Sequence, residues 1–120
     1  LYGKSLGTGV ASYLASKKDC NQLILETPYS NFPAVFSHYM PIYPFKTLLH
    51  YQFPTEQYLQ KVDVPIRIVH GTSDFVISHR QAIQLTKRKK GIELLLIKDG
   101  SHNNLFNFQQ ARSTLRQWLL

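Results

Sequence analysis

The sequence predicts an α/β fold built on a mostly parallel sheet with flanking helices. Two observations support this prediction. Short apolar runs alternate with segments of helical periodicity, and turn residues such as glycine and proline bound the runs. Parallel strands need long crossovers, which the helical segments supply. The runs that we expect to form buried strands are 22–26, 66–71 and 92–98.

Three segments have the spacing of helices: 6–18, 79–90 and 109–120. Basic residues close the first two, as is common in the last turn of a helix. The residues at helical spacing are Val10, Ala11, Leu14 and Ala15 in the first segment, Ala82, Ile83, Leu85 and Thr86 in the second, and Ala111, Leu115, Trp118 and Leu119 in the third. We expect the second set to pack inward and the third set to lie on one stripe of its helix.

Residues 28–58 break this rhythm and are predicted to form a small aromatic cap or lid. They hold nine of the fourteen Tyr and Phe residues and five of the six prolines, which is too irregular for a plain crossover helix. One group fits either the cap or an amphipathic helix over the sheet: Phe32, Phe36, Tyr39 and Met40. A second group is predicted to form the wall of an apolar substrate pocket: Tyr43, Phe45, Tyr51 and Phe53.

The charge of the chain bears on its partners. The formal net charge is +7, and its most obvious local source is the run 87–90. Basic residues offset the dipole of a helix that ends before Gly91, and no aromatic residues interleave the run. We therefore expect no nucleic-acid partner, while association with an anionic membrane surface stays open.

Cysteine usage and apolar runs bear on location. Cys20 is the one cysteine, so no internal disulfide can form, and its expected role is packing in a reducing compartment. The sequence contains no run of about 18 apolar residues, so no membrane-spanning helix is predicted from it. We expect a cytoplasmic location, with membrane association open. No targeting segment is visible in a chain that begins with Leu rather than Met, and we expect it to be a fragment.

The motif Gly3-Lys4-Ser5-Leu6-Gly7 fits the pattern G-x-S-x-G, which places a serine on a tight bend between a strand and a helix. A serine hydroxyl is a poor nucleophile near neutral pH. It needs a base to remove its proton and a third group to orient that base. The motif alone therefore decides nothing, and the question is where its partners lie.

The partners are predicted from the topology of a parallel sheet, whose functional groups gather at the carboxyl ends of the strands. Ser5 follows residues that could end a strand, Asp74 follows the run 66–71, and His102 follows the run 92–98. All three are therefore expected at one edge. Their order along the chain is Ser, Asp, His, which is the order that accompanies this kind of serine bend.

Asp74 has a structural alternative and two rivals. Taken alone, its side chain could cap the next helix or close an Asx turn after the strand. Asp63 precedes its strand rather than following it. Asp99 lies only three residues from His102 and would have to fold back to reach it. Asp74 is therefore the favoured acid.

Four other histidines compete with His102 for the role of base. His70 lies within a predicted strand, where a hydrogen-bonded role in the core is favoured, and His79 is expected to open a helix. The remaining two lie in the predicted cap: His38 and His50. No pair of them has metal-ligand spacing with a carboxylate, so we expect no metal and no cofactor.

Two glycine-rich motifs offer alternatives to a nucleophilic serine. The letters "GKS" match the end of a phosphate-binding loop whose first glycine would precede Leu1. That interpretation leaves the later Asp and His loops without a role. A dinucleotide-binding fingerprint fails, because Ser12 stands where a glycine or alanine is required.

Four segments together resemble the α/β-hydrolase family: "YGKSLGTGVA", "LILETPYS", "PIRIVHGTSDFVIS" and "DGSHNN". They look like the C-terminal part of serine hydrolases of the Bem46-like and ABHD17-like groups, and the resemblance covers nearly the whole chain. It implies that residues 1–120 are the C-terminal portion of a single α/β-hydrolase domain, with 28–58 as a cap inserted in it. The family has several strands before the serine bend, so we expect a missing N-terminal half, or another chain, at an open sheet edge.

The resemblance also implies an activity and roles for particular residues. It implies a serine hydrolase that cleaves an acyl ester or thioester through an acyl-enzyme intermediate, with a peptidase or a lipase as the open alternatives. The aromatic cap favours a small acyl or lipid-like substrate. Ser5 would be the nucleophile, His102 the base, and Asp74 the residue that orients the imidazole. The N–H of Leu6 would be one oxyanion donor.

Within the same resemblance, Gly3 and Gly7 would keep side chains out of a crowded bend. Lys4, between the glycine and the serine, is expected to be a solvated surface residue rather than a contact for an acidic substrate. The competing class is an α/β-hydrolase fold that binds a partner or ligand without turnover. The presence of all three residue types, at the expected places, favours the enzyme.

Overall fold

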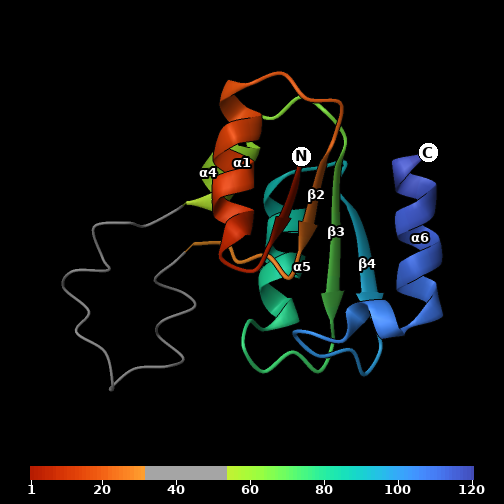
Figure 1. Ribbon diagram of the computed structural model, residues 1–120. Helices are drawn as coiled ribbons and strands as arrows, with labels where there is room; N and C mark the ends of the chain where they lie inside the picture. Colours follow the sequence, from red (N-terminus) through yellow and green to blue (C-terminus); the bar gives the residue numbers. More distant parts are fainter. Residues whose placement is uncertain (32–53) are drawn as a thin grey trace, which may run out of the picture.

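The computed structural model describes residues 1–31 and 54–120. Their elements follow in the order β1 (Tyr2–Lys4), α1 (Gly7–Lys17), β2 (Leu23–Glu26), α4 (Thr55–Leu59), β3 (Ile66–Gly71), α5 (His79–Arg88), β4 (Glu93–Ile97), the 3₁₀ helix η1 (Leu105–Asn107) and α6 (Gln109–Leu119). Figure 1 shows the sheet with helices on both sides. The predicted α/β class is confirmed.

The described strands form one sheet in the order β1-β2-β3-β4, and every neighbouring pair is parallel. The three predicted strands are present within one residue of their expected bounds, and β1 supplies the strand end expected before Ser5. Because all strands run the same way, their carboxyl ends meet at one edge, where the arrowheads lie in Figure 1. The loops that leave this edge carry the candidate residues.

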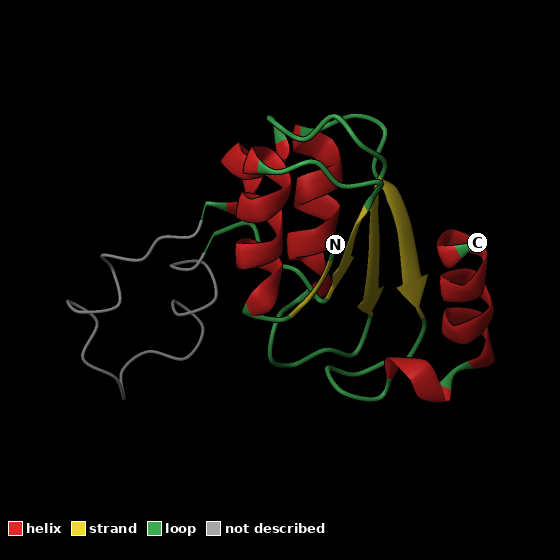
Figure 2. Ribbon diagram, turned by 45° about the horizontal axis from the view of Figure 1, so that its top comes forward, coloured by secondary structure: helices red, strands yellow, loops and turns green. Residues whose placement is uncertain are grey.

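Side chains alternate between two cores along the strands, as the pleat requires. Leu23 and Leu25 of β2, with Ile68 of β3, enter a core shared with α1, α4 and α5. Ile24 of β2 and Val69 of β3 enter a second core on the opposite face, which η1 and α6 cover. Figure 2 shows α6 on one side of the sheet and the other α-helices on the opposite side. Burial on both faces explains why these strands read as continuous apolar runs.

The predicted helices are confirmed to within two residues, and the structure adds which side chains α1 and α6 bury. Helix α1 buries small side chains: Thr8, Gly9, Ala11 and Ser12. Val10 and Leu14, at the same helical spacing, are 47% and 38% exposed. In α6, Ala111 and Trp118 of the predicted stripe are buried, whereas Leu119 is 63% exposed and lies outside the core. Small residues allow α1 to approach the sheet closely, which periodicity of apolar residues alone does not reveal.

The described ends of the segment 28–58 belong to the body of the fold. Tyr29 and Ser30 are buried, and the short helix α4 brings Leu59 into the core beneath α1. The sequence did not predict this helix as a separate element. The remainder of the predicted cap lies outside the described residues, as do the predicted pocket residues: Tyr43, Phe45, Tyr51 and Phe53.

Candidate functional site

Ser5 lies on the bend between β1 and α1, with its backbone in the left-handed region at φ 52°. This conformation is uncommon for a residue with a Cβ and needs support from its surroundings. The N–H of Ser5 donates to the carbonyl of Glu26 at 2.9 Å. The Ser5 carbonyl accepts from the backbone N–H of Thr8 at 3.0 Å and from its hydroxyl at 2.6 Å. The bend is thus held on both sides.

The two glycines of the motif behave differently. A Cβ on Gly3 would lie 2.7 Å from the Cβ of Ala11 and 2.8 Å from the carbonyl oxygen of Gly7, so only glycine lets α1 pack this closely. At Gly7, a Cβ would meet no described atom within 4 Å. The steric role expected of Gly3 therefore holds, and the one expected of Gly7 was wrong, because Gly7 faces open space at the start of α1.

Asp74 follows β3 in a loop that its own side chain organises. One carboxylate oxygen, Oδ1, accepts from the N–H groups of Val76 and Ile77, each at 2.8 Å. The Asx-turn alternative is therefore correct as well, since one oxygen closes the turn and leaves the other free to face a partner. The following helix is capped by Ser78 instead, whose hydroxyl accepts from the N–H of Arg80 at 3.3 Å.

The loop that carries His102 is joined to the Asp74 loop through two glycines. The N–H of Ser73 donates to the carbonyl of Gly100 at 2.8 Å. A Cβ on Gly71 would lie 2.2 Å from that same carbonyl oxygen, so the two loops meet at a distance that only glycine permits. Sequence reasoning used Gly71 only as the end of a strand and missed this contact.

The structure brings Ser5, His102 and Asp74 together at the carboxyl edge of the sheet. Ser5 Oγ lies 3.0 Å from His102 Nε2, and His102 Nδ1 lies 2.9 Å from Asp74 Oδ2. A carboxylate only accepts, so Nδ1 carries the hydrogen and Nε2 is left to accept from the serine. The Asp74 side chain is fully buried, whereas that of His102 is 13% exposed. Ser5 and His102 are 97 positions apart in the sequence, and Asp74 and His102 are 28 positions apart.

Burial works against ionisation of Asp74, but its hydrogen bonds outweigh that effect. Desolvation raises the pKa of this carboxyl, while donors from His70, the Ile77 backbone and His102 lower it. The net result lowers the pKa of Asp74 from 3.8 to about 2. The carboxylate is therefore ionised throughout the physiological range, where it can stabilise an imidazolium beside it.

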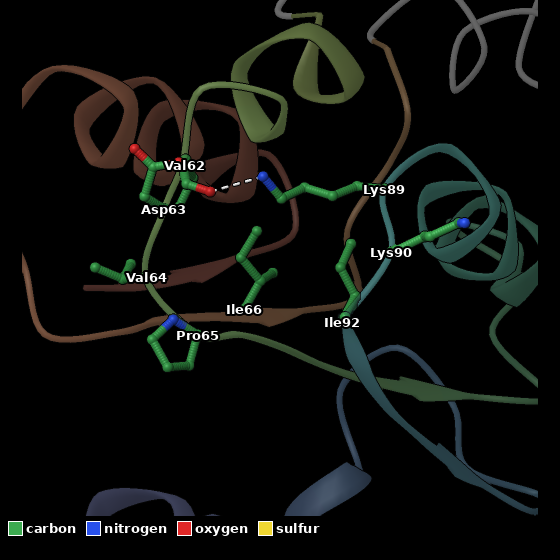
Figure 3. A pocket seen from close by; sticks show the side chains of 9 residues that line it. Val62, Asp63, Val64, Pro65, Ile66, Lys89, Lys90 and Ile92 are labelled. Carbon is green, nitrogen blue, oxygen red and sulfur yellow. Dashed lines mark hydrogen bonds between the residues drawn. The ribbon is translucent and has the colours of Figure 1, made fainter.

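Three of the rivals, His79, Asp99 and Asp63, form no hydrogen bond with the side chains of Ser5 or His102, and His38 and His50 lie outside the described residues. His79 opens α5 as expected, and the Asp99 backbone takes the left-handed conformation at φ 62° while its N–H donates to the Thr72 hydroxyl. Asp63 lies at the opposite, amino edge of the sheet, beside a cavity of about 340 Å³. Figure 3 shows that cavity, where Lys89 Nζ donates to the carbonyl of Val62 at 2.7 Å.

Two residues that support the serine bend were not singled out by the sequence. Tyr29 is fully buried and its hydroxyl donates to the carbonyl of Leu6 at 3.1 Å, and burial raises the pKa of this phenol to about 12. Glu26 is also buried, and its carboxylate accepts from the Tyr2 hydroxyl and pairs with Lys4 at 3.2 Å. Lys4 is exposed, as expected of a solvated surface residue, and its ammonium group also pairs with this buried acid.

The Leu6 N–H, the predicted oxyanion donor, has no hydrogen-bond partner among residues 1–31 and 54–120. It follows Ser5 directly, at the amino end of α1.

Among residues 1–31 and 54–120, no three His, Cys, Asp or Glu side chains are grouped so that they could hold a metal ion. None of the described helices is long and apolar enough to cross a membrane.

Comparison with known proteins places the chain in a family. The family model described as "Alpha/beta hydrolase domain" matches residues 1–118. Alpha/beta hydrolase domain-containing protein 17C of Xenopus tropicalis is 31% identical over 121 residues, which cover 99% of this chain and 37% of that protein. The chain therefore belongs to the α/β-hydrolase family. It is similar to the alpha/beta hydrolase domain-containing proteins 17 and spans little more than a third of their length.

Solved structures share the fold. The esterase domain of a Rhodothermus marinus protein aligns with a TM-score of 0.76 at 14% identity, over 98% of this chain and 59% of that chain. An alpha-beta serine hydrolase homologue from Coxiella burnetii aligns with a TM-score of 0.70 at 20% identity, over 100% of this chain and 48% of that one. At these identities the similarity concerns the fold.

Proposed function

We propose that the protein is a serine hydrolase that cleaves acyl esters or thioesters through Ser5, His102 and Asp74. The observation that carries the proposal is the unbroken hydrogen-bonded relay from the Ser5 hydroxyl through the imidazole to a buried, ionised carboxylate. A relay of this geometry is what activates a serine hydroxyl near neutral pH.

The mechanism follows from the positions of the atoms. His102 Nε2 takes the proton of Ser5 Oγ as the oxygen attacks the acyl carbonyl, and Asp74 stabilises the imidazolium that forms. Collapse of the tetrahedral intermediate breaks the ester or thioester bond of the substrate, and Nε2 gives the proton to the departing alcohol or thiol. Water then attacks the acyl-serine by the same route, with His102 again as base, and releases the acid.

The Leu6 N–H is proposed as one oxyanion donor. It is adjacent to the nucleophile, lies at the amino end of α1 and has no partner in the described part of the chain. Loss of one such donor typically lowers turnover roughly 100- to 1000-fold. Tyr29, which holds the Leu6 carbonyl, supports the orientation of this peptide.

An apolar substrate is favoured by the side chains at the rim of the site. Leu6, next to the nucleophile, is 52% exposed, and Phe75, next to Asp74, is 85% exposed. Such surfaces suit an acyl chain or an aromatic ester better than a charged sugar.

The test uses the full-length natural protein and a fluorophosphonate probe, which modifies an activated serine. We expect wild type to be labelled and Ser5→Ala to remain unlabelled, with loss of hydrolysis of short-chain nitrophenyl esters and acyl thioesters. A folded Ser12→Ala variant is a matched control, because that serine is buried in α1 and donates to the Thr8 carbonyl. It should label like wild type.

The competing interpretation is a protein that binds an acyl ligand without turnover. It would be supported if folded wild type and Ser5→Ala were labelled equally, or if neither were labelled while both bound a fluorescent fatty acyl ligand. Either result would contradict the proposed hydrolase.

A further inference from the structure

A second imidazole, that of His70, contacts the loop that carries Asp74. His70 belongs to β3, its side chain is fully buried, and its Nε2 lies 2.7 Å from the carbonyl oxygen of Ile77. The same nitrogen lies 3.4 Å from Asp74 Oδ2. The carboxylate thus has an imidazole on each side, with His102 at the shorter distance.

The partners of His70 fix its tautomer. A carbonyl and a carboxylate both accept, so Nε2 carries the hydrogen. Nδ1 is then an acceptor, and it is buried without a hydrogen-bond partner among the described residues. Leaving a buried ring nitrogen unpaired is unfavourable, so packing of the core alone would favour an apolar residue at position 70.

The contact with Ile77 links His70 to Asp74 mechanically. Ile77 is buried, and while its carbonyl accepts from His70, its N–H donates to Asp74 Oδ1 at 2.8 Å. The rigid strand β3 therefore fixes one residue of the loop, and that residue fixes the carboxylate. Without His70, the buried Ile77 carbonyl loses its partner and the loop must shift to find another.

We propose that His70 is a positioning residue of the site, which holds the Ile77 peptide and the Asp74 carboxylate so that Asp74 Oδ2 faces His102. This role rests on the proposed function. His70 does not touch the serine, and it acts only through Asp74 and the loop that carries it. The expected core role of His70 is thereby extended: the same hydrogen bond that satisfies it in the core also orients the acid.

Two variants of the full-length protein carry the same amide group on side chains of different length, so they test whether a donor must reach the Ile77 carbonyl. In His70→Gln the side-chain amide reaches about as far as Nε2 and can still donate to the Ile77 carbonyl. In His70→Asn the same amide is one methylene shorter and falls short of it. We expect Asn to slow fluorophosphonate labelling of Ser5 roughly 10- to 100-fold, the scale of a small misplacement in an active site, with little change in ester KM. Gln should label within about threefold of wild type.

Ser78→Ala is the matched control, because it loosens the far end of the same loop by removing the cap of α5 without touching Asp74. It should label like wild type. All rates are taken below the melting temperature of each variant, so that a purely structural loss of stability does not register. If His70→Asn does not fold, His70→Leu of similar volume takes its place.

Three labelling results would overturn the proposal: wild-type labelling by folded His70→Asn, equal slowing by the Asn and Gln variants, or equal slowing by Ser78→Ala. A crystal structure of the Asn variant gives a readout that needs no activity. We expect the distance from Asp74 Oδ2 to His102 Nδ1 to exceed about 3.5 Å, beyond hydrogen-bond range. An unlabelled wild type with this lengthened distance in the variant would contradict the hydrolase and leave the positioning role standing. An unchanged distance would contradict the positioning role.

Discussion

Three described residues other than glycine have left-handed backbone, and each follows a strand of the sheet directly or after one residue: Ser5, Thr27 and Asp99. Each costs of order 1–3 kcal/mol and persists only where neighbouring groups hold it. Around Ser5 the holding groups are visible, since Glu26 and Thr8 bind its peptide. Strain of this kind concentrates at the edge that carries the relay, which is where an exposed serine must be presented.

At the residue scale, pH tests the state of Asp74. Its pKa in the folded protein is lowered from 3.8 to about 2, so ionised Asp74 stabilises the fold fully above about pH 4. That contribution is lost as pH falls toward 2. We expect the difference in unfolding free energy between wild type and Asp74→Asn to shrink as pH is lowered from 5 to 2, measured by urea denaturation.

The same substitution should lower turnover near neutral pH by about 10⁴-fold, because Asn cannot favour the Nδ1–H tautomer of His102. Asp63→Asn, at the opposite edge of the sheet, is the control and should keep wild-type turnover. A stability difference that stays constant from pH 5 to pH 2 would show that Asp74 is not held ionised by its neighbours.

At the scale of elements, the site is built where strand ends and helix starts are forced close together. The loop after β3 and the loop after β4 touch through Gly71 and Gly100, and α1 rests on β1 through Gly3 and Ala11. In each case a missing Cβ sets the distance between two elements. Helix α6 lies on the other face, where the Trp118 indole N–H donates to Glu93 at 2.8 Å and anchors it beside β4.

Gly71→Ala tests the contact between loops. A Cβ at 2.2 Å from the Gly100 carbonyl oxygen cannot be accommodated without separating the loops of Asp74 and His102. We expect about 1–3 kcal/mol of destabilisation, the usual cost of overpacking, and slower labelling of Ser5. Thermal unfolding and labelling kinetics measure the two effects.

Gly7→Ala is the comparison, because nothing described lies near its added methyl group and alanine is the better helix former. Its melting temperature should equal or exceed that of wild type. If Gly71→Ala were as stable and as readily labelled as wild type, the two loops would not depend on their close approach.

At the scale of the whole molecule, β1 is an edge strand of the sheet formed by residues 1–31 and 54–120. Apolar side chains around that edge and along α1 are exposed: Leu1, Tyr2, Leu6, Val10 and Leu14. An unpaired strand beside an apolar surface invites pairing with another chain. The relatives in the same family extend well beyond the length of this chain. We propose that further polypeptide, or a second chain, covers this edge.

Residues 1–120 produced alone are therefore expected to self-associate and to hydrolyse esters poorly, as measured by light scattering after size exclusion and by nitrophenyl ester turnover. Val10→Lys with Leu14→Lys, on the exposed stripe of α1, should reduce the association, because charge opposes apolar contact. A monodisperse monomer of residues 1–120 with normal ester turnover would contradict this prediction.

Much of the fold could be predicted from local patterns. The strands β2 and β3 follow from apolar runs bounded by proline and glycine, and α5 follows from its periodicity and basic end. The faces of α1 could not, because its contact with the sheet is made by small residues such as Ala11, which carry almost no hydrophobic signal. The short helix α4 was hidden in a segment whose composition suggested a cap.

The sequence by itself determined the parallel α/β class, the order of Ser5, Asp74 and His102, and the strand after which each one comes. Local periodicity and turn residues encode these features. Only the tertiary structure decided the distances of 3.0 and 2.9 Å between them, the pairing of Lys4 with Glu26, and the contact of His70 with the Asp74 loop. Such contacts join residues distant in sequence, and their geometry depends on how layers pack, which no local pattern records.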